Sequence, residues 1–241
     1  MLIQKNPLTM VGTLTRCWLF AYRTSVDHAR SLLPPQLEVI EHRNCAFWNV
    51  VVCQVDNMRP KLSPLSMGVT YWHVAYRLYV RFRPRNHEPI TGLYFLRSDC
   101  DNPLLALAGN VLTDFNFHCA SVSVAQNDQS IEMKVAAPDG DAYVMIKPNE
   151  QPQLPADSVF GSLEEAAGFL KYQPNGISIE GDGRANVVHI LRDEQAWRYK
   201  LVSVEEARWS FFKKESISLE ICYQVEPVFY QWNKARIYDA E

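Results

Sequence analysis

An alternation of side chains with a period of two in one long segment limits the fold of this chain more than any other feature. Across residues 69–83 every even position from 72 to 82 is apolar or aromatic, whereas the odd positions include His73 and Arg77. A period of two is that of a β-strand, so the segment predicts a long strand with one buried face. Pro84 ends the strand, because proline has no N–H to donate to a neighbouring strand.

Two more strands and a helix are predicted directly after this segment. Residues 92–99 form the second strand, and Asn102 followed by Pro103 is typical of the N-cap and first position of a helix. Residues 104–113 are apolar nearly all round, which predicts a buried helix, with Gly109 allowing close backbone approach. A third strand over residues 115–125 completes this scaffold.

The rest of the chain adds strands and two short helices, without a linker, repeat or low-complexity tract. Ser25 and Ser162 are predicted to cap helices over residues 26–33 and 163–170, and a turn at residues 138–141 predicts a hairpin. Further strands are expected over residues 14–22, 37–40, 46–55, 131–136, 142–146, 177–180, 185–190, 198–204, 217–225 and 228–232. Residues 1–241 are therefore predicted to form one β-rich α+β domain with a barrel-like or strongly bent sheet.

Composition argues against several classes of function. A net charge of -3 gives no general electrostatic attraction to nucleic acid or membrane. The six cysteines show no Cys-x-x-Cys spacing, so no zinc site or redox pair is predicted, and no cofactor motif is found. No signal peptide and no run near the roughly 18 apolar residues of a membrane span is present. We therefore expect a cytoplasmic protein with reduced thiols.

Several short motifs, in their order along the chain, resemble the YqjF-like family of uncharacterised bacterial proteins (domain of unknown function 2071). The fold of that family is grouped with acetoacetate decarboxylase. The resemblance is carried by residues 32–38, 50–53 and 58–60, by the strands over 79–81 and 92–99, and by the helix that follows. It implies a single-domain, β-rich fold that encloses a central cavity.

The same resemblance bears on decarboxylation, because acetoacetate decarboxylase needs a lysine that forms a Schiff base with its β-keto acid. In that family the lysine lies on the strand after the helix. The corresponding residues 114–120 contain no lysine, and none occurs between Lys61 and Lys134. Decarboxylation by that mechanism is therefore disfavoured, although Lys134 or Lys147 could reach the cavity from another strand.

His118 occupies this part of the strand, and Asn116 is expected to share its face. One interpretation is a polar pocket wall, with His118 as an acid/base group and Asn116 as an orienting amide. The alternative is a buried histidine whose ring is satisfied by backbone groups.

Two further pairs are candidates for substrate binding. His73 and Arg77 share one face of the long strand, and Arg97 and Asp99 share one face of its predicted partner. If these faces line the cavity, an arginine can grip a substrate carboxylate with two hydrogen bonds. The alternative is an arginine–aspartate network on a solvated sheet face, since alternation does not distinguish the lumen from solvent.

Three functions follow from these residues. The first is a protein that binds a small anionic organic molecule, without Schiff-base chemistry. The second is a lysine-independent lyase, isomerase or hydrolase that uses His118 with an arginine. The third is a non-catalytic structural module, which can form homo-oligomers.

Overall fold

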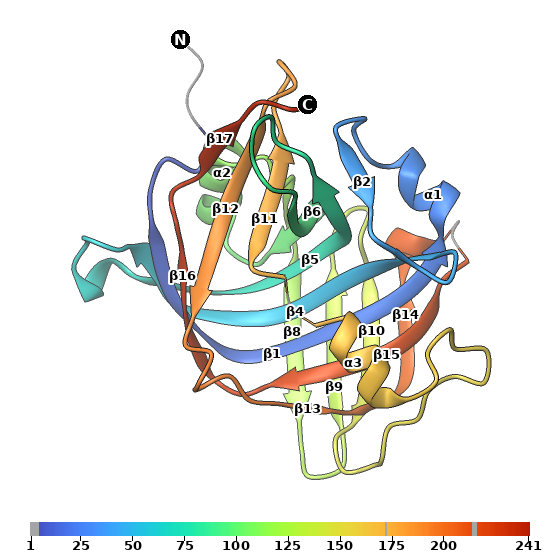
Figure 1. Cartoon of the computed structure of the whole chain (residues 1–241). Helices are drawn as coiled ribbons and strands as arrows, with labels where there is room; N and C mark the ends of the chain where they lie inside the picture. The colour runs from blue at the N-terminus through green and yellow to red at the C-terminus, as the bar shows by residue number, and fades with distance from the viewer. Residues whose placement is uncertain (1–4, 172, 214–215) are drawn as a thin grey trace.

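The computed structural model describes residues 5–171, 173–213 and 216–241, and seven strands of this described chain close into a barrel (Figure 1). Around the barrel the order is β1 (Met10–Ser25), β16 (Val228–Trp232), β12 (Ala185–Arg192), β11 (Asn175–Ile179), β6 (Ile90–Cys100), β5 (Val69–Phe82) and β4 (Cys45–Pro60). The ring closes because β1 pairs with β16 along one edge and with β4 along the other. The predicted β-rich fold with a barrel-like sheet is confirmed.

Shorter strands extend this sheet beyond the barrel. The strand β15 pairs with β1 past the end of β16, so β1 serves two neighbours along one edge. These additional strands are β2 (Leu37–Val39), β3 (Glu41–His42), β7 (Phe117–Cys119), β13 (Tyr199–Leu201), β15 (Ser218–Val225) and β17 (Arg236–Tyr238).

A second sheet of four strands covers the outer face of β1, β4 and β5. Its strands are β8 (Ser121–Gln126), β9 (Ile131–Ala136), β10 (Ala142–Lys147) and β14 (Ser203–Trp209), in the order β14-β10-β9-β8. Figure 1 shows them crossing behind the barrel strands. The Trp209 ring packs edge-on against Phe20 of the barrel at 5.5 Å between ring centroids. The predicted hairpin at residues 138–141 joins β9 to β10.

The long strand β5 is buried on both faces, so the expectation of one buried face is wrong. Its odd positions, such as Ala75 and Tyr79, belong to the core inside the barrel. Its even positions, such as Val74 and Tyr76, belong to the core between the barrel and the second sheet. The alternation identified a strand, but the polar-looking face is the one that lines the barrel interior.

The three predicted helices are present as α1 (Val26–Ser31), α2 (Pro103–Leu112) and α3 (Leu163–Phe169). The predicted caps are confirmed, since the side-chain oxygens of Ser25, Asn102 and Ser162 each accept a backbone N–H in the first turn. Two short 3₁₀ turns, η1 (Leu65–Met67) and η2 (Ser210–Phe212), complete the elements. None of the described helices has the length and apolar character needed to span a membrane.

The helix α2 is not buried all round, which corrects the prediction made from its apolar sequence. Leu104 and Leu107 are 79% and 65% exposed, and Ala106 is the buried residue of the helix. One face of α2 closes over the barrel and the other faces solvent. An apolar sequence does not reveal this division, because both faces carry similar side chains.

Two segments predicted as single strands are each divided between the two sheets. The predicted strand over residues 115–125 splits at Ala120 into β7, which joins the barrel sheet, and β8, which joins the second sheet. The predicted strand over residues 198–204 splits at Val202 into β13 and β14 in the same manner. The chain therefore crosses between layers at points where the apolar pattern is continuous.

Candidate functional site

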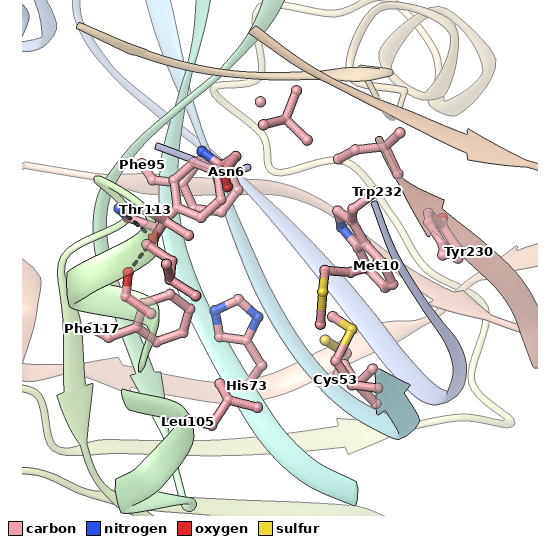
Figure 2. Close-up of a pocket in the computed structure, with 18 of the residues that line it drawn as sticks. Asn6, Met10, Cys53, His73, Phe95, Leu105, Thr113, Phe117, Tyr230 and Trp232 are labelled. Atoms are coloured by element: carbon pink, nitrogen blue, oxygen red, sulfur yellow. Dashed lines mark hydrogen bonds between the residues drawn. The ribbon is translucent and has the colours of Figure 1, made fainter. Parts of the chain in front are cut away.

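The barrel encloses a cavity of about 230 Å³ whose wall is mostly apolar. Side chains from β1, β4, β5, β12 and β16 form its sides, and residues of α2 and the N-terminal segment close it. Figure 2 shows Met10 and Trp232 on one side of this space and Phe95 and Phe117 on the other. The site is therefore a small apolar chamber with few polar groups.

The helix α2 closes the cavity and packs closely against the Phe117 ring at Gly109. A Cβ atom at Gly109 would lie 2.4 Å from the ring of Phe117, so the absence of a side chain lets the helix approach this ring. Asn110 fixes the same contact, because its amide donates to the Phe117 carbonyl at 2.8 Å and accepts the Phe117 N–H at 2.7 Å. The prediction of close backbone approach at Gly109 is confirmed.

Three residues with reactive side chains lie side by side on the cavity wall. In the register of the sheet, Cys17 of β1 is opposite Cys53 of β4, and Cys53 is opposite His73 of β5. All three line the cavity. The His73 ring also stacks on Phe117, with 5.5 Å between centroids (Figure 2). Its Nε2 atom is buried and has no hydrogen-bond partner within the described part of the chain.

Arg77 lies deeper on the same face of β5 and is held by a buried polar network. Its guanidinium donates to the side-chain oxygen of Asn49 on β4 and lies 5.4 Å from the centroid of the Phe95 ring. The Asn49 amide donates to the Tyr79 hydroxyl at 2.7 Å, and that hydroxyl donates to the Leu170 carbonyl at 2.7 Å. The network therefore fixes the orientation of a guanidinium that lines a mostly apolar cavity.

Arg97 and Asp99 lie on the other side of the sheet. Arg97 is opposite Tyr76 and Asp99 is opposite Val74, and these two β5 residues belong to the outer core. The Arg97 Nε atom donates to the Asp99 carboxylate at 2.8 Å, and the β9–β10 turn packs on this arginine at Gly140. Burial raises the pKa of Asp99, against the lowering effect of the Arg97 charge. Arg97 and Asp99 thus form a buried ion pair between the layers.

His118 and Asn116 also lie outside the set of residues that line the cavity, whereas Phe115 and Phe117 belong to it. Asn116 adopts a left-handed conformation with φ of 52°, and its amide donates to the Leu96 carbonyl at 2.8 Å. His118 pairs in parallel register with Asp99. The structure therefore brings His73 and Arg77 together in the cavity. It places Arg97 and Asp99 on the outer side of the barrel sheet, with His118 in register beside Asp99.

Among the described residues that line the cavity there is no lysine. Lys5 donates to the Val111 carbonyl at the end of α2 at 3.2 Å. Lys134 and Lys147, the two that could have reached the cavity, pair with Glu132 and Glu205 at 3.0 Å on the second sheet.

Sequence reasoning missed Cys17, Cys53 and Asn49. The two cysteines are far apart in the chain, and a search for short Cys spacings does not detect partners that only strand pairing brings together. Asn49 lies within a run of apolar residues in β4, where a buried amide calls for a hydrogen-bonding partner. That irregularity is a signal that sequence inspection can use. No group of three or more metal-binding side chains is suitably arranged among the described residues.

Comparison with known proteins agrees with this architecture. The family model of DUF2071, described as an uncharacterized conserved protein, matches residues 13–229. No curated protein sequence matches the chain.

Solved structures show the same fold at low identity. An acetoacetate decarboxylase-like enzyme from Sphingomonas wittichii RW1 has a TM-score of 0.61 at 12% identity, covering 98% of this chain and 95% of that one. Acetoacetate decarboxylase from Legionella pneumophila gives 0.60 at 11% identity, covering 95% and 87%. The enduracididine biosynthesis enzyme MppR, complexed with pyruvate, gives 0.58 at 12% identity, covering 98% and 91%. At identities this low, the similarity shows that the fold is shared and does not extend to activity.

Proposed function

The chain belongs to the DUF2071 family of uncharacterised conserved proteins, and from that premise we propose that it binds a small organic acid in its barrel cavity without forming a Schiff base. The observation that carries the proposal is the position of Arg77. This side chain is 7% exposed, lines a mostly apolar cavity and donates to the neutral amide of Asn49.

The chemistry of this site favours a carboxylate with an apolar body. A guanidinium matches a carboxylate with paired hydrogen bonds, and such bonds are stronger where water is excluded. The apolar wall favours a hydrocarbon or aromatic body, since burial of apolar surface contributes roughly 25 cal/mol per Å². The cavity of about 230 Å³ is smaller than the roughly 300–1,000 Å³ of pockets for drug-sized ligands, which favours a small acid.

Two further observations support this assignment. MppR, which shares the fold, has been solved in complex with pyruvate, a small carboxylic acid. The cavity of the present chain has no lysine among its described lining residues, so the proposal uses ion pairing rather than imine formation. The acid/base role predicted for His118 is not part of the proposal, because Phe117 rather than His118 belongs to the cavity wall.

A thermal-shift screen tests the proposal. A panel of short-chain and aromatic carboxylic acids should include members that raise Tm by about 5–10 °C at concentrations near a hundred times Kd, as linkage predicts for a chain of this size. The corresponding amides or alcohols should produce no comparable shift. Arg77→Met should abolish the response, because it keeps an apolar stem and removes the charge.

Arg81→Met is the matched control, since Arg81 is on the same strand but pairs with Glu38 at the surface at 3.9 Å. It should retain the full shift. The proposal is wrong if no acid raises Tm, or if Arg77→Met and Arg81→Met respond equally. Borohydride treatment in the presence of each stabilising acid should leave every lysine unmodified, and a reduced adduct on a lysine would show Schiff-base chemistry.

A further inference from the structure

Cys17 and Cys53 are close enough in the sheet to form a disulfide bond. They are directly opposite each other in the antiparallel β1–β4 pair. Directly opposed residues in such a pair have Cα atoms about 4.5–5.5 Å apart, within the range of about 4.4–6.8 Å that a disulfide needs. Both thiols are free, are 3% and 4% exposed, and line the cavity. A Cys17–Cys53 bond therefore requires little movement of the backbone.

The two thiols differ in their surroundings. A hydrogen bond from Cys17 lowers the pKa of Cys53, with further lowering from a hydrogen bond with His73 and from the charge of Arg77, against the opposing effect of burial. The pKa of Cys17 is raised by the same hydrogen bond to Cys53 and by burial. Cys53 is thus the better thiolate, and Cys17 remains protonated until a base accepts its proton.

His73 supplies a base next to Cys53, on the side of β4 away from Cys17. It is opposite Cys53 in the β4–β5 register, and its buried Nε2 atom has no hydrogen-bond partner in the described residues. A neutral imidazole with an unpaired nitrogen can accept a proton. The three residues therefore form a continuous row of partner thiol, nucleophile and base within one cavity, with Cys53 in the middle.

We propose that Cys17 and Cys53 are a redox-active dithiol pair that reduces small disulfides, with Cys53 as the attacking thiolate, Cys17 as the resolving thiol and His73 as the acceptor of the Cys53 proton. This inference does not depend on acid binding at Arg77. The co-reactant is a disulfide RSSR small enough to enter the cavity.

The reaction has two exchange steps. The Cys53 thiolate attacks one sulfur of RSSR, the S–S bond of RSSR breaks, and a mixed Cys53–SR disulfide forms as RS⁻ leaves. Cys17 then attacks the Cys53 sulfur, the Cys53–SR bond breaks, and the proton of the Cys17 thiol goes to the second RS⁻ as it leaves. The first RS⁻ takes the proton that His73 accepted from Cys53, so two RSH form. The protein dithiol loses two electrons and two protons, which reduce RSSR.

A second pair of neighbouring cysteines provides an internal comparison. Cys100 and Cys119 are opposite each other in the parallel β6–β7 register, but neither belongs to the cavity wall. Burial raises the pKa of Cys100, and its thiol donates to the Asn102 carbonyl at 3.4 Å. Because Cys119 is exposed, it would react first with any reagent in solution, and it is best removed before the test.

The experiment therefore uses the Cys119→Ser protein and 2-hydroxyethyl disulfide, a small neutral reagent. Non-reducing peptide mapping should show a Cys17–Cys53 disulfide, with the loss of two hydrogen atoms. Adding Cys17→Ser should trap a mixed disulfide on Cys53. Adding Cys53→Ser instead should leave Cys17 at least about tenfold less reactive than Cys53.

Two outcomes overturn the proposal. One is a Cys119→Ser protein in which Cys17 and Cys53 stay reduced under reagent that oxidises an unfolded sample of the same chain. The other is equal modification of Cys17 in the Cys119→Ser/Cys53→Ser protein and of Cys53 in the Cys119→Ser/Cys17→Ser protein. The first comparison keeps both cavity thiols, so it holds even if a serine in the cavity prevents folding. Circular dichroism and Tm establish that the serine variants are folded.

Discussion

The guanidinium of Arg77 donates to the side-chain oxygen of Asn49, so that a charge on β5 is fixed by a neutral amide on β4 inside the barrel. Asn49 is 1% exposed and is itself held by the Tyr79 hydroxyl. The proposed function depends on this relationship, because the amide fixes the orientation of the arginine on the cavity wall.

Asn49→Asp tests this dependence by replacing the amide with a carboxylate. The new carboxylate would pair with Arg77 and compete with an incoming acid, so we expect the ligand-induced rise in Tm to be lost while the protein remains folded. Isothermal titration with a stabilising acid measures the effect. An Asn49→Asp protein that binds the acid as tightly as the original chain would contradict the assignment of Arg77.

Tyr79→Phe removes the hydroxyl that links Asn49 to the end of α3. The Leu170 carbonyl and the Asn49 amide would then be buried without this partner, at a cost of about 1–3 kcal/mol in the free energy of unfolding. Urea denaturation measures this loss. Tyr199→Phe is a suitable control, because Tyr199 is 46% exposed and its substitution should change stability by less than about 0.5 kcal/mol. Equal effects of the two substitutions would mean that the network contributes little.

Gly109→Ala tests the packing of α2 over the cavity. Alanine is favoured in a helix, by up to about 1 kcal/mol over glycine, but here its Cβ would lie 2.4 Å from the Phe117 ring. We expect a net destabilisation of about 1–3 kcal/mol from overpacking.

Gly168→Ala in α3 is the matched control, because a Cβ there meets nothing within 4 Å. It should leave stability unchanged or raise it by up to about 1 kcal/mol. If both glycine substitutions stabilise the protein, then α2 does not pack against Phe117 as described.

The pH dependence of alkylation tests the environment of Cys53. The pKa of Cys53 is lowered chiefly by the Cys17 hydrogen bond, with His73 and Arg77 adding to it, so the thiolate should persist below the usual thiol range. Burial raises the pKa of Cys45, so its thiolate should disappear sooner as pH falls. Iodoacetamide labelling of the Cys119→Ser protein from pH 9 to pH 6, followed by peptide mapping, should therefore show a loss of labelling at Cys45 before Cys53. Parallel loss at both sites would contradict the lowered pKa.

The sequence predicted individual elements more successfully than their relations in space. The alternation in β5 identified a long strand, and the caps at Asn102 and Ser162 identified the starts of α2 and α3. The face of β5 that lines the lumen was not predictable, because the barrel and the second sheet bury both faces. Two predicted strands were divided for the same reason, since apolar patterning continues where the chain passes from one sheet to the other.

The candidate site was predictable in part. His73 and Arg77 were identified because they share a face of one strand, and the structure places both on the cavity wall. Arg97 was grouped with them, but its register opposite Tyr76 turns it to the other side. The pairing of Cys17 with Cys53 depends on the register of β1 against β4, and local spacing contains no information on that register.

A crystal structure with the acid that produces the largest thermal shift tests the central claim most directly. We expect the carboxylate to lie within hydrogen-bonding distance of the Arg77 guanidinium and the body of the acid to contact the apolar wall around Phe95. An acid bound on the outer surface, or joined covalently to a lysine Nζ, would contradict it.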